Sequence, residues 1–153
     1  MTLWNDFPDE LKKSTIEVHL KPANIFKFHN SQSNPPKIKF ITLIANRKDA
    51  VNESFAYLFI NSNINQKIYG KHHELIQLHE IILKSDYDFL EHNSYIDCNK
   101  IYEINQDEIY RRCEENIGIY SGTLNNIDFQ KVIQKVKKST GIKNELKTAY
   151  NLI

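Results

Sequence analysis

The segment KIKFITLIAN, residues 37–46, is apolar at both odd and even positions and is rich in β-branched and aromatic residues. Successive side chains of a strand point to opposite faces of a sheet, so a strand of this composition has to be covered on both faces. We therefore predict a buried strand here, with other elements packed on each side. A chain of 153 residues can supply them, because a domain of this size buries roughly 70% of the surface of its unfolded chain.

Further strands are expected on both sides of this segment, and polar loops separate them. A loop is predicted at SQSNPP (31–36), because two consecutive prolines cannot both serve a central strand. Two more polar stretches, 46–54 and 61–73, are predicted as a loop and a turn-rich connection. The strands themselves are predicted at ANIFKFHN (23–30), FAYLFINS (55–62), ELIQLHEIIL (74–83) and LEHNSYIDCNKIYEI (90–104).

Helices are predicted at both ends of the chain. The first sixteen residues form a short helix with Pro8 in its first turn. Asn105 and Glu108 have the spacing of a capping box, which predicts a second helix there. A longer helix is expected from 121 to 139, after a strand fragment or turn at IGIYSG, and the last dozen residues extend it or fray. The pattern as a whole predicts a mainly β, α+β fold with a small curled antiparallel sheet or barrel.

The composition limits which binding partners and which cellular compartment are expected for the protein. The net charge of +1 provides no global attraction to nucleic acid or to a membrane surface, so an anion site has to be a local patch. Cys98 and Cys113 are too few for a disulfide scaffold and are expected to be free thiols in a reducing compartment. No apolar run approaches the ~20 residues that span a bilayer. We therefore expect a cytoplasmic protein with no membrane partner.

Three segments, in order, carry a family resemblance: KIKFITLIAN, FAYLFINS, and the long stretch from LEHNSYIDCNKIYEI to the predicted helix ending in STGI. Together they resemble the MazF/PemK family of toxin endoribonucleases over residues 20–142. The resemblance implies an SH3-like barrel with a C-terminal helix, in one domain (1–153) with an N-terminal helical extension (1–19) and a tail (143–153). It also implies a homodimer that cleaves single-stranded RNA without a cofactor or metal and is neutralised by a small acidic antitoxin.

The resemblance also assigns positions in the site. Lys39 falls where the family usually has Arg, and Asn61 falls at the hydroxyl position, with the alcohol of Ser62 beside it. Asn99 stands where many members have Asp, and Tyr102 stands where they have Arg. We expect the curled sheet to bring Lys39 and Ser62 to one shared groove.

RNA cleavage by its own 2′-hydroxyl requires a base near that oxygen, an acid near the leaving 5′ oxygen, and positive charge at the phosphate. We predict that Lys39 supplies charge and an acid proton, that Asp97 is the base, and that His29 is a proton shuttle. Ser62 completes the predicted catalytic set as a hydrogen-bond donor.

RNA binding is assigned to a second group of residues. Amides and aromatic rings are the side chains that contact base edges and stack on unpaired bases. The predicted nucleic-acid-binding residues are Lys37, Asn61, Asn99 and Tyr95. Phe28 and Tyr69 are further candidates for stacking on bases.

Each of these residues also has an ordinary structural explanation, so a second hypothesis stays open. Because Arg, Thr and Asp are replaced at the family's key positions, the same barrel would serve as a catalytically inactive module that binds protein or nucleic acid. Whether the chain is an enzyme is therefore undecided at this point. KHHELIQLH offers His72, His73 and His79 as zinc ligands, but neighbouring histidines cannot both face one ion from a regular strand, so no metal site is predicted.

Overall fold

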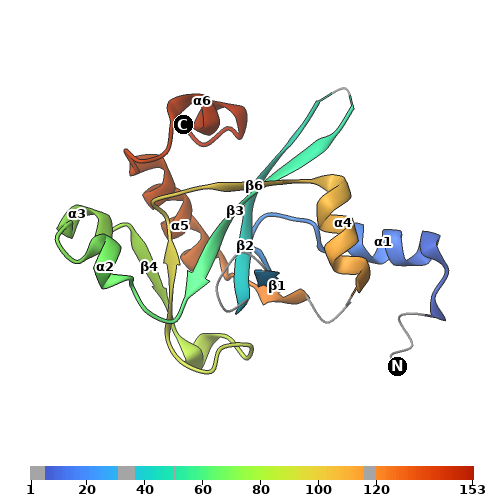
Figure 1. The fold of residues 1–153 in the computed structure, drawn as a ribbon, viewed down its shortest axis with the longest axis horizontal. Helices are drawn as coiled ribbons and strands as arrows, with labels where there is room; N and C mark the ends of the chain where they lie inside the picture. The colour runs from blue at the N-terminus through green and yellow to red at the C-terminus, as the bar shows by residue number, and fades with distance from the viewer. Residues whose placement is uncertain (1–5, 31–36, 50, 116–119) are drawn as a thin grey trace.

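The centre of the protein is one antiparallel sheet that curls from one edge to the other (Figure 1). The computed structural model describes residues 6–30, 37–49, 51–115 and 120–153, except for the side chains at 29–30, 37 and 114–115. Within these residues seven strands pair in the order β4-β5-β3-β2-β1-β7, and β6 also pairs with β3. The strands are β1 (Asn24–Asn30), β2 (Lys37–Lys48), β3 (Glu53–Asn61), β4 (His79–Ile82), β5 (Ser94–Asp97), β6 (Tyr102–Asn105) and β7 (Tyr120–Thr123).

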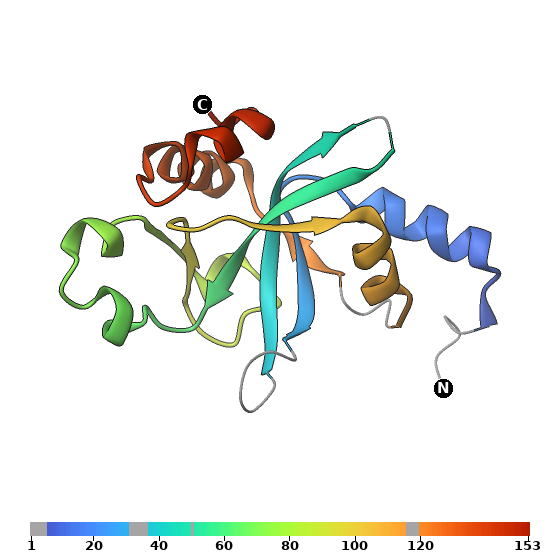
Figure 2. The same ribbon diagram turned by 45° about the horizontal axis from the view of Figure 1, so that its top comes forward.

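Helices pack on both sides of this sheet (Figure 2). Helices α1 and α4 lie together at one end, and α5 and α6 lie towards the other. The helices are α1 (Asp9–His19), α2 (Gln66–Tyr69), α3 (His73–Ile76), α4 (Gln106–Glu115), α5 (Asn126–Lys138) and α6 (Asn144–Ala149), with a short 3-10 turn η2 (Lys84–Asp86). The predicted α+β class with a mainly antiparallel, curled sheet is confirmed.

Strand β2 is buried on both faces, as its composition predicts. Ile41 and Leu43 belong to a core cluster that α1 and α4 complete, whereas Ile44 and Ala45 belong to a second cluster that α5 completes. A register shift in the pairing with β3 lies between Leu43 and Ala45, and such a bulge changes which face consecutive residues present. The strand therefore joins the two halves of the core.

The loop predicted at 46–54 is much shorter in the structure. Strand β2 continues to Lys48 and β3 begins at Glu53, and these two residues pair across the hairpin. The turn is closed by Asp49, whose carboxylate accepts hydrogen bonds from the backbone of Asn52 (2.8 Å) and Val51 (3.0 Å). These hydrogen bonds lower the pKa of Asp49. The polar composition of the segment reflects an exposed hairpin arm and not a break in the strands.

The strand predicted at 74–83 is wrong in its first half. Helix α3 occupies His73–Ile76, and β4 begins only at His79. The preceding connection contains α2, which Asn65 caps by accepting hydrogen bonds from the backbone of Lys67 and Ile68. A short apolar run such as LIQL fits one helical turn as well as a strand, so periodicity alone does not separate the two.

Residues 90–104 contain two short strands, β5 and β6, which run in the same direction along β3 and are separated by an irregular segment. Ile96 of β5 lies opposite Ile60, and Tyr102 of β6 lies opposite Tyr57, so both pieces pair antiparallel with β3. Two residues of β3 consequently face the five residues 97–101. We call this the 97–101 bulge. It explains why the segment reads as a strand and yet carries polar side chains that a regular strand would not accommodate.

Two hydrogen bonds connect the bulge to neighbouring elements. The backbone N–H of Cys98 donates to the carbonyl of Leu78 (3.0 Å), which lies just before β4. The hydroxyl of Ser139, at the end of α5, donates to the carbonyl of Asn99 (3.2 Å). Cys98 is completely buried beneath these contacts.

The helices predicted at the chain ends are present with shifted boundaries. Helix α1 begins after Pro8 and continues past the predicted end, to His19. The predicted cap at Asn105 is confirmed, since its side chain accepts the backbone N–H of Glu108 at 2.9 Å. Helix α5 begins at Asn126, not at 121, because Asn125 caps it and the residues before it form β7. The loop predicted at 31–36 and the first residues of IGIYSG lie outside the described residues.

Across the residues that the structure describes, no helix combines the length and the apolar character needed to cross a membrane.

Candidate functional site

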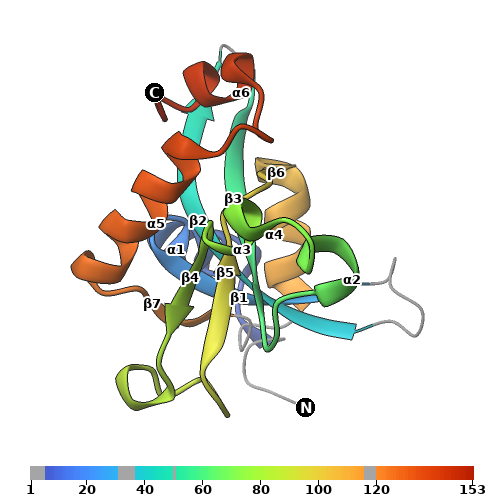
Figure 3. The same cartoon turned by 90° about the vertical axis from the view of Figure 1, so that its left-hand side faces the viewer.

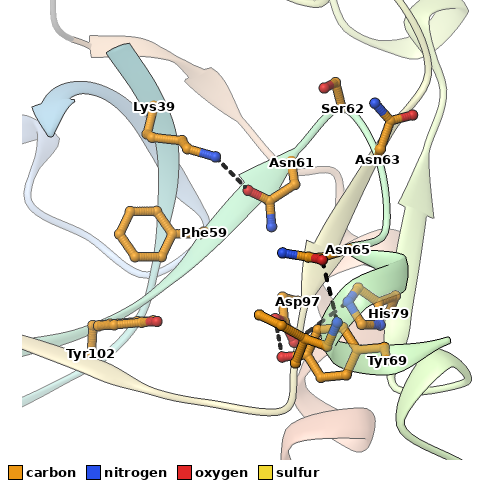
Figure 4. A pocket seen from close by; sticks show the side chains of 11 residues that line it. Lys39, Phe59, Asn61, Ser62, Asn63, Asn65, Tyr69, His79, Asp97 and Tyr102 are labelled. Atoms are coloured by element: carbon orange, nitrogen blue, oxygen red, sulfur yellow. Dashed lines mark hydrogen bonds and ion pairs between the residues drawn. The ribbon is translucent and has the colours of Figure 1, made fainter. Parts of the chain in front are cut away.

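A pocket of about 460 Å³ opens where β3 leaves the sheet towards α2 (Figure 4). Its volume is within the ~300–1,000 Å³ range of small-molecule sites. Figure 3 shows α2 and α3 turned towards the viewer, beside the ends of the strands. The polar part of the lining comes from β2, the end of β3, β4 and β5, and includes Lys39, Asn61, Ser62, His79 and Asp97.

Lys39 and Asn61 form a pair on the wall of the pocket. The Lys39 ammonium donates a hydrogen bond to the side-chain oxygen of Asn61 at 3.0 Å, and both residues are half-buried. Because that oxygen is the acceptor, the amide nitrogen of Asn61 remains a donor. The pair therefore presents a positive charge and N–H groups at one place, which suits the oxygen atoms of a phosphate. Ser62 and Asn63 lie at the rim beyond Asn61 (Figure 4).

Asp97 lies across the pocket and accepts three hydrogen bonds. The Tyr69 hydroxyl donates to one carboxylate oxygen at 2.8 Å. The backbone and side-chain nitrogens of Asn99 donate to the other, at 2.9 and 3.0 Å. Burial, and then the hydrogen bond to Asp97, raise the pKa of Tyr69 far above the physiological range, so its hydroxyl stays a neutral donor. Asp97 is therefore held in one orientation.

His79 packs beside Asp97 and Tyr69. Its Nδ1 lies 3.0 and 3.2 Å from the carbonyl oxygens of Leu75 and Ile76. Carbonyls only accept, so Nδ1 carries a proton and Nε2 is the atom that faces Asp97, at 3.6 Å. The imidazole ring also meets the Tyr69 ring edge-on, with centroids 4.9 Å apart. This histidine fastens α3 to the pocket and is almost fully buried.

Aromatic rings form the remaining side of the pocket. The rings of Phe59 and Tyr102 meet edge-on with centroids 4.6 Å apart. Tyr57 stacks on Tyr102 at 5.7 Å, and the Lys100 ammonium lies 4.8 Å from the centre of the Tyr102 ring. Half-buried aromatic faces next to a cation are surfaces on which unpaired bases stack.

Four of the predicted site residues lie together. Lys39, Asn61, Ser62 and Asp97 all line the pocket, although they come from three strands spread over almost sixty positions of sequence. The expectation that Lys39 and Ser62 share one groove is met by this geometry. Tyr69, a predicted stacking residue, also lines the pocket, but its hydroxyl is committed to Asp97.

Other predicted residues lie elsewhere. Phe28 is 2% exposed inside the core cluster under α1 and α4, so its prediction as a base-stacking residue is wrong. Tyr95 pairs with Asn61 across β3 and β5, beside the pocket. Asn99 is buried, with its amide donating to Leu75 and Asp97, so it orients Asp97 and does not face the pocket directly.

For His29 and Lys37 only the backbone is described. His29 pairs with Ile38 and Lys37 pairs with Asn30, which puts both at the end of the β1–β2 ladder, next to the pair formed by Phe28 and Lys39. Their predicted roles as proton shuttle and RNA contact remain predictions.

Sequence reasoning missed the role of His79, which it considered only as a possible zinc ligand. The signal that identifies it is its position at the start of β4 directly after α3, which only the fold reveals. Among the described residues no group of three or more His, Cys, Asp or Glu side chains is placed to hold a metal ion.

No family model matches the chain, and no curated protein matches it.

Proposed function

We propose that the protein is a toxin-type endoribonuclease of the MazF/PemK class that cuts single-stranded RNA in the pocket around Lys39 and Asp97. The observation that carries the proposal is the convergence of Lys39, Asn61, Ser62 and Asp97, predicted from separate segments, on one pocket of suitable size. In this proposal the curled sheet is a divergent SH3-like barrel, and the protein acts as a cytoplasmic homodimer neutralised by a small acidic antitoxin.

The proposed reaction is attack of the 2′-oxygen on the neighbouring phosphorus, which breaks the bond to the 5′-oxygen and leaves a 2′,3′-cyclic phosphate and a 5′-hydroxyl. Lys39 and the Asn61 amide bind the phosphate oxygens as negative charge develops on them. Asp97 takes the proton of the 2′-hydroxyl, and the Lys39 ammonium gives a proton to the departing 5′-oxygen. Ser62 adds a hydrogen bond at the rim, and His29 replenishes protons.

A cleavage assay on a mixed-sequence RNA tests the proposal. We expect Lys39→Ala to lower the cleavage rate by about a hundredfold or more, because it removes the charge at the phosphate. Ser62→Ala should lower it by about tenfold, a single neutral hydrogen bond. Lys48→Ala removes the same charge at the exposed hairpin arm and is the matched control. Equal activity of Lys39→Ala and Lys48→Ala would refute the assignment.

One observation favours a second candidate, a binding module without catalysis. Both carboxylate oxygens of Asp97 already accept hydrogen bonds from within the protein, from Tyr69 and from Asn99, so a substrate hydroxyl has to compete with these donors. A purified protein that leaves varied single-stranded RNAs intact but binds RNA or a partner protein tightly would establish this alternative. Growth arrest on expression, relieved by Lys39→Ala and Ser62→Ala, would instead support the toxin.

A further inference from the structure

A second pocket, also of about 460 Å³, adjoins the first and shares three of its residues. Lys39, Asn61 and Ser62 line both, so they form the ridge between the two hollows. The second hollow lies between the ends of β2 and β3 and the segment 89–94, which leads into β5. A ligand bound at the ridge therefore extends into one pocket, the other, or both.

The floor of this second pocket is aromatic. The rings of Phe40 and Phe89 lie 5.0 Å apart at an interplanar angle of 57°, and both are half-buried. The Lys27 ammonium is 5.8 Å from the centre of the Phe40 ring. Aromatic surface beside a cation is the combination that binds unpaired bases irrespective of sequence.

The rim of the second pocket is polar and fixed in shape. Glu91 and His92 are exposed there, and the buried Ser94 donates its hydroxyl to the carbonyl of His92 at 3.1 Å. A carboxylate at this rim disfavours a phosphate but accepts hydrogen bonds from the exocyclic amino group of a base. The positive charge at the ridge and the negative charge at the rim thus separate a site for phosphate from a site for a base.

We propose that this second pocket, the Phe40–Phe89 pocket, binds a nucleobase of the same RNA strand whose phosphate lies on Lys39 and Asn61. The inference rests on the proposed function, because it takes single-stranded RNA as the ligand of the first pocket. It adds that the minimal well-bound substrate spans at least two nucleotides, one on each side of the ridge.

Binding of uncleavable RNA tests this inference separately from catalysis. Mixed-sequence 2′-O-methyl RNA lacks the attacking hydroxyl, so mono- and trinucleotides of this type are titrated into the protein by calorimetry. We expect the trinucleotide to bind the wild type at least about tenfold more tightly than the mononucleotide, because an additional base stacks. Phe89→Leu keeps an apolar side chain but removes the ring, and should abolish most of this gain. Phe7→Leu is the same change at an exposed position before α1 and should retain it.

A second measurement does not depend on a variant. The aromatic proton signals of Phe40 and Phe89 should shift in NMR spectra on addition of the trinucleotide and not on addition of inorganic phosphate. An unchanged length dependence in Phe89→Leu, or trinucleotide binding without these shifts, would overturn the inference. Length-dependent binding by a protein that cuts no RNA would overturn the proposed nuclease function and leave this inference intact.

Discussion

Strands β5 and β6 each carry one carboxylate that accepts a hydrogen bond from a tyrosine hydroxyl, but the two carboxylates differ in their surroundings. Tyr69 donates to Asp97 of β5 and Tyr150 donates to Glu103 of β6, both at 2.8 Å. The Glu103 side chain is 41% exposed and lies 3.7 Å from the Arg47 guanidinium, on the surface of the hairpin arm. The Asp97 side chain lines the pocket and is 18% exposed, because Tyr69 of α2, His79 of β4 and Asn99 of the bulge surround it.

An acidic residue on an alternating strand does not identify a functional site by itself. Both carboxylates belong to one alternating segment of sequence, but they lie on opposite faces of the sheet. Tyr102 lines the pocket together with Asp97, and Glu103, the next residue of β6, points the other way. Their surroundings differ as well: Tyr69 of α2 and His79 of β4 contact Asp97, whereas Glu103 lies beside Tyr150 and the exposed Arg47.

The largest effect expected in this comparison comes from the core beneath the two strands. Ile96→Ala removes a fully buried side chain of β5 and should lower the free energy of unfolding by about 3 kcal/mol or more. Ile104→Ala in β6, at 7% exposure, should cost about 1 kcal/mol less, since water reaches the site more readily. Urea denaturation measures both, and an equal or reversed order would show that the two halves of the strand are equivalent in packing.

The next largest effect is expected from the asparagine side chains that hold the bulge and the end of β6. Asn99→Ala removes the amide that donates to Leu75 and Asp97, both in a buried setting, and should destabilise the protein by about 2 kcal/mol. Asn105→Ala removes the exposed cap of α4 at the end of β6 and should cost about 1 kcal/mol. Thermal unfolding of the two variants compares them. If the asparagine of the bulge proved no more costly than the cap, the bulge would not depend on this amide.

The smallest effect comes from the tyrosine hydroxyls themselves. Tyr69→Phe should lower the free energy of unfolding by about 1.5 kcal/mol, because little water reaches Asp97 to replace the lost donor. Tyr150→Phe should cost about 0.5–1 kcal/mol, since Glu103 is accessible to water and keeps Arg47 nearby. Matched urea curves of the two variants give the difference, which should vanish if the two carboxylates are equally solvated.

Much of the fold was predictable because local patterns agreed with the tertiary structure. The two-sided burial of β2 and the Asn105 cap depend on residues within one segment, and both were read from it correctly. The helix–strand division at 73–82 was not predictable, because the same apolar residues fit either state until His79 contacts Asp97. The 97–101 bulge depends on its register against β3, a contact about forty residues away that no local pattern encodes.

The candidate site also has a part that the sequence predicts and a part that it does not. Lys39, Asn61 and Ser62 were predicted from the resemblance of their own segments, and the pairing of β2 with β3 was enough to bring them together. The network around Asp97 was not predictable, because Tyr69 reaches it only after α2 forms and turns back over β5. The sequence thus predicted that the strand residues Lys39, Asn61 and Asp97 share one site, but it did not predict the contacts that Tyr69 and His79 make with Asp97.

The burial of Cys98 beneath the bulge gives the protein an internal reporter. Burial raises the pKa of this thiol to about 12, so almost none of it is the reactive thiolate at neutral pH. Cys113 is also buried, in the other core cluster under α4. Alkylation of either thiol therefore requires the cover above it to lift, and the rates at the two positions report separately how often each side of the sheet opens.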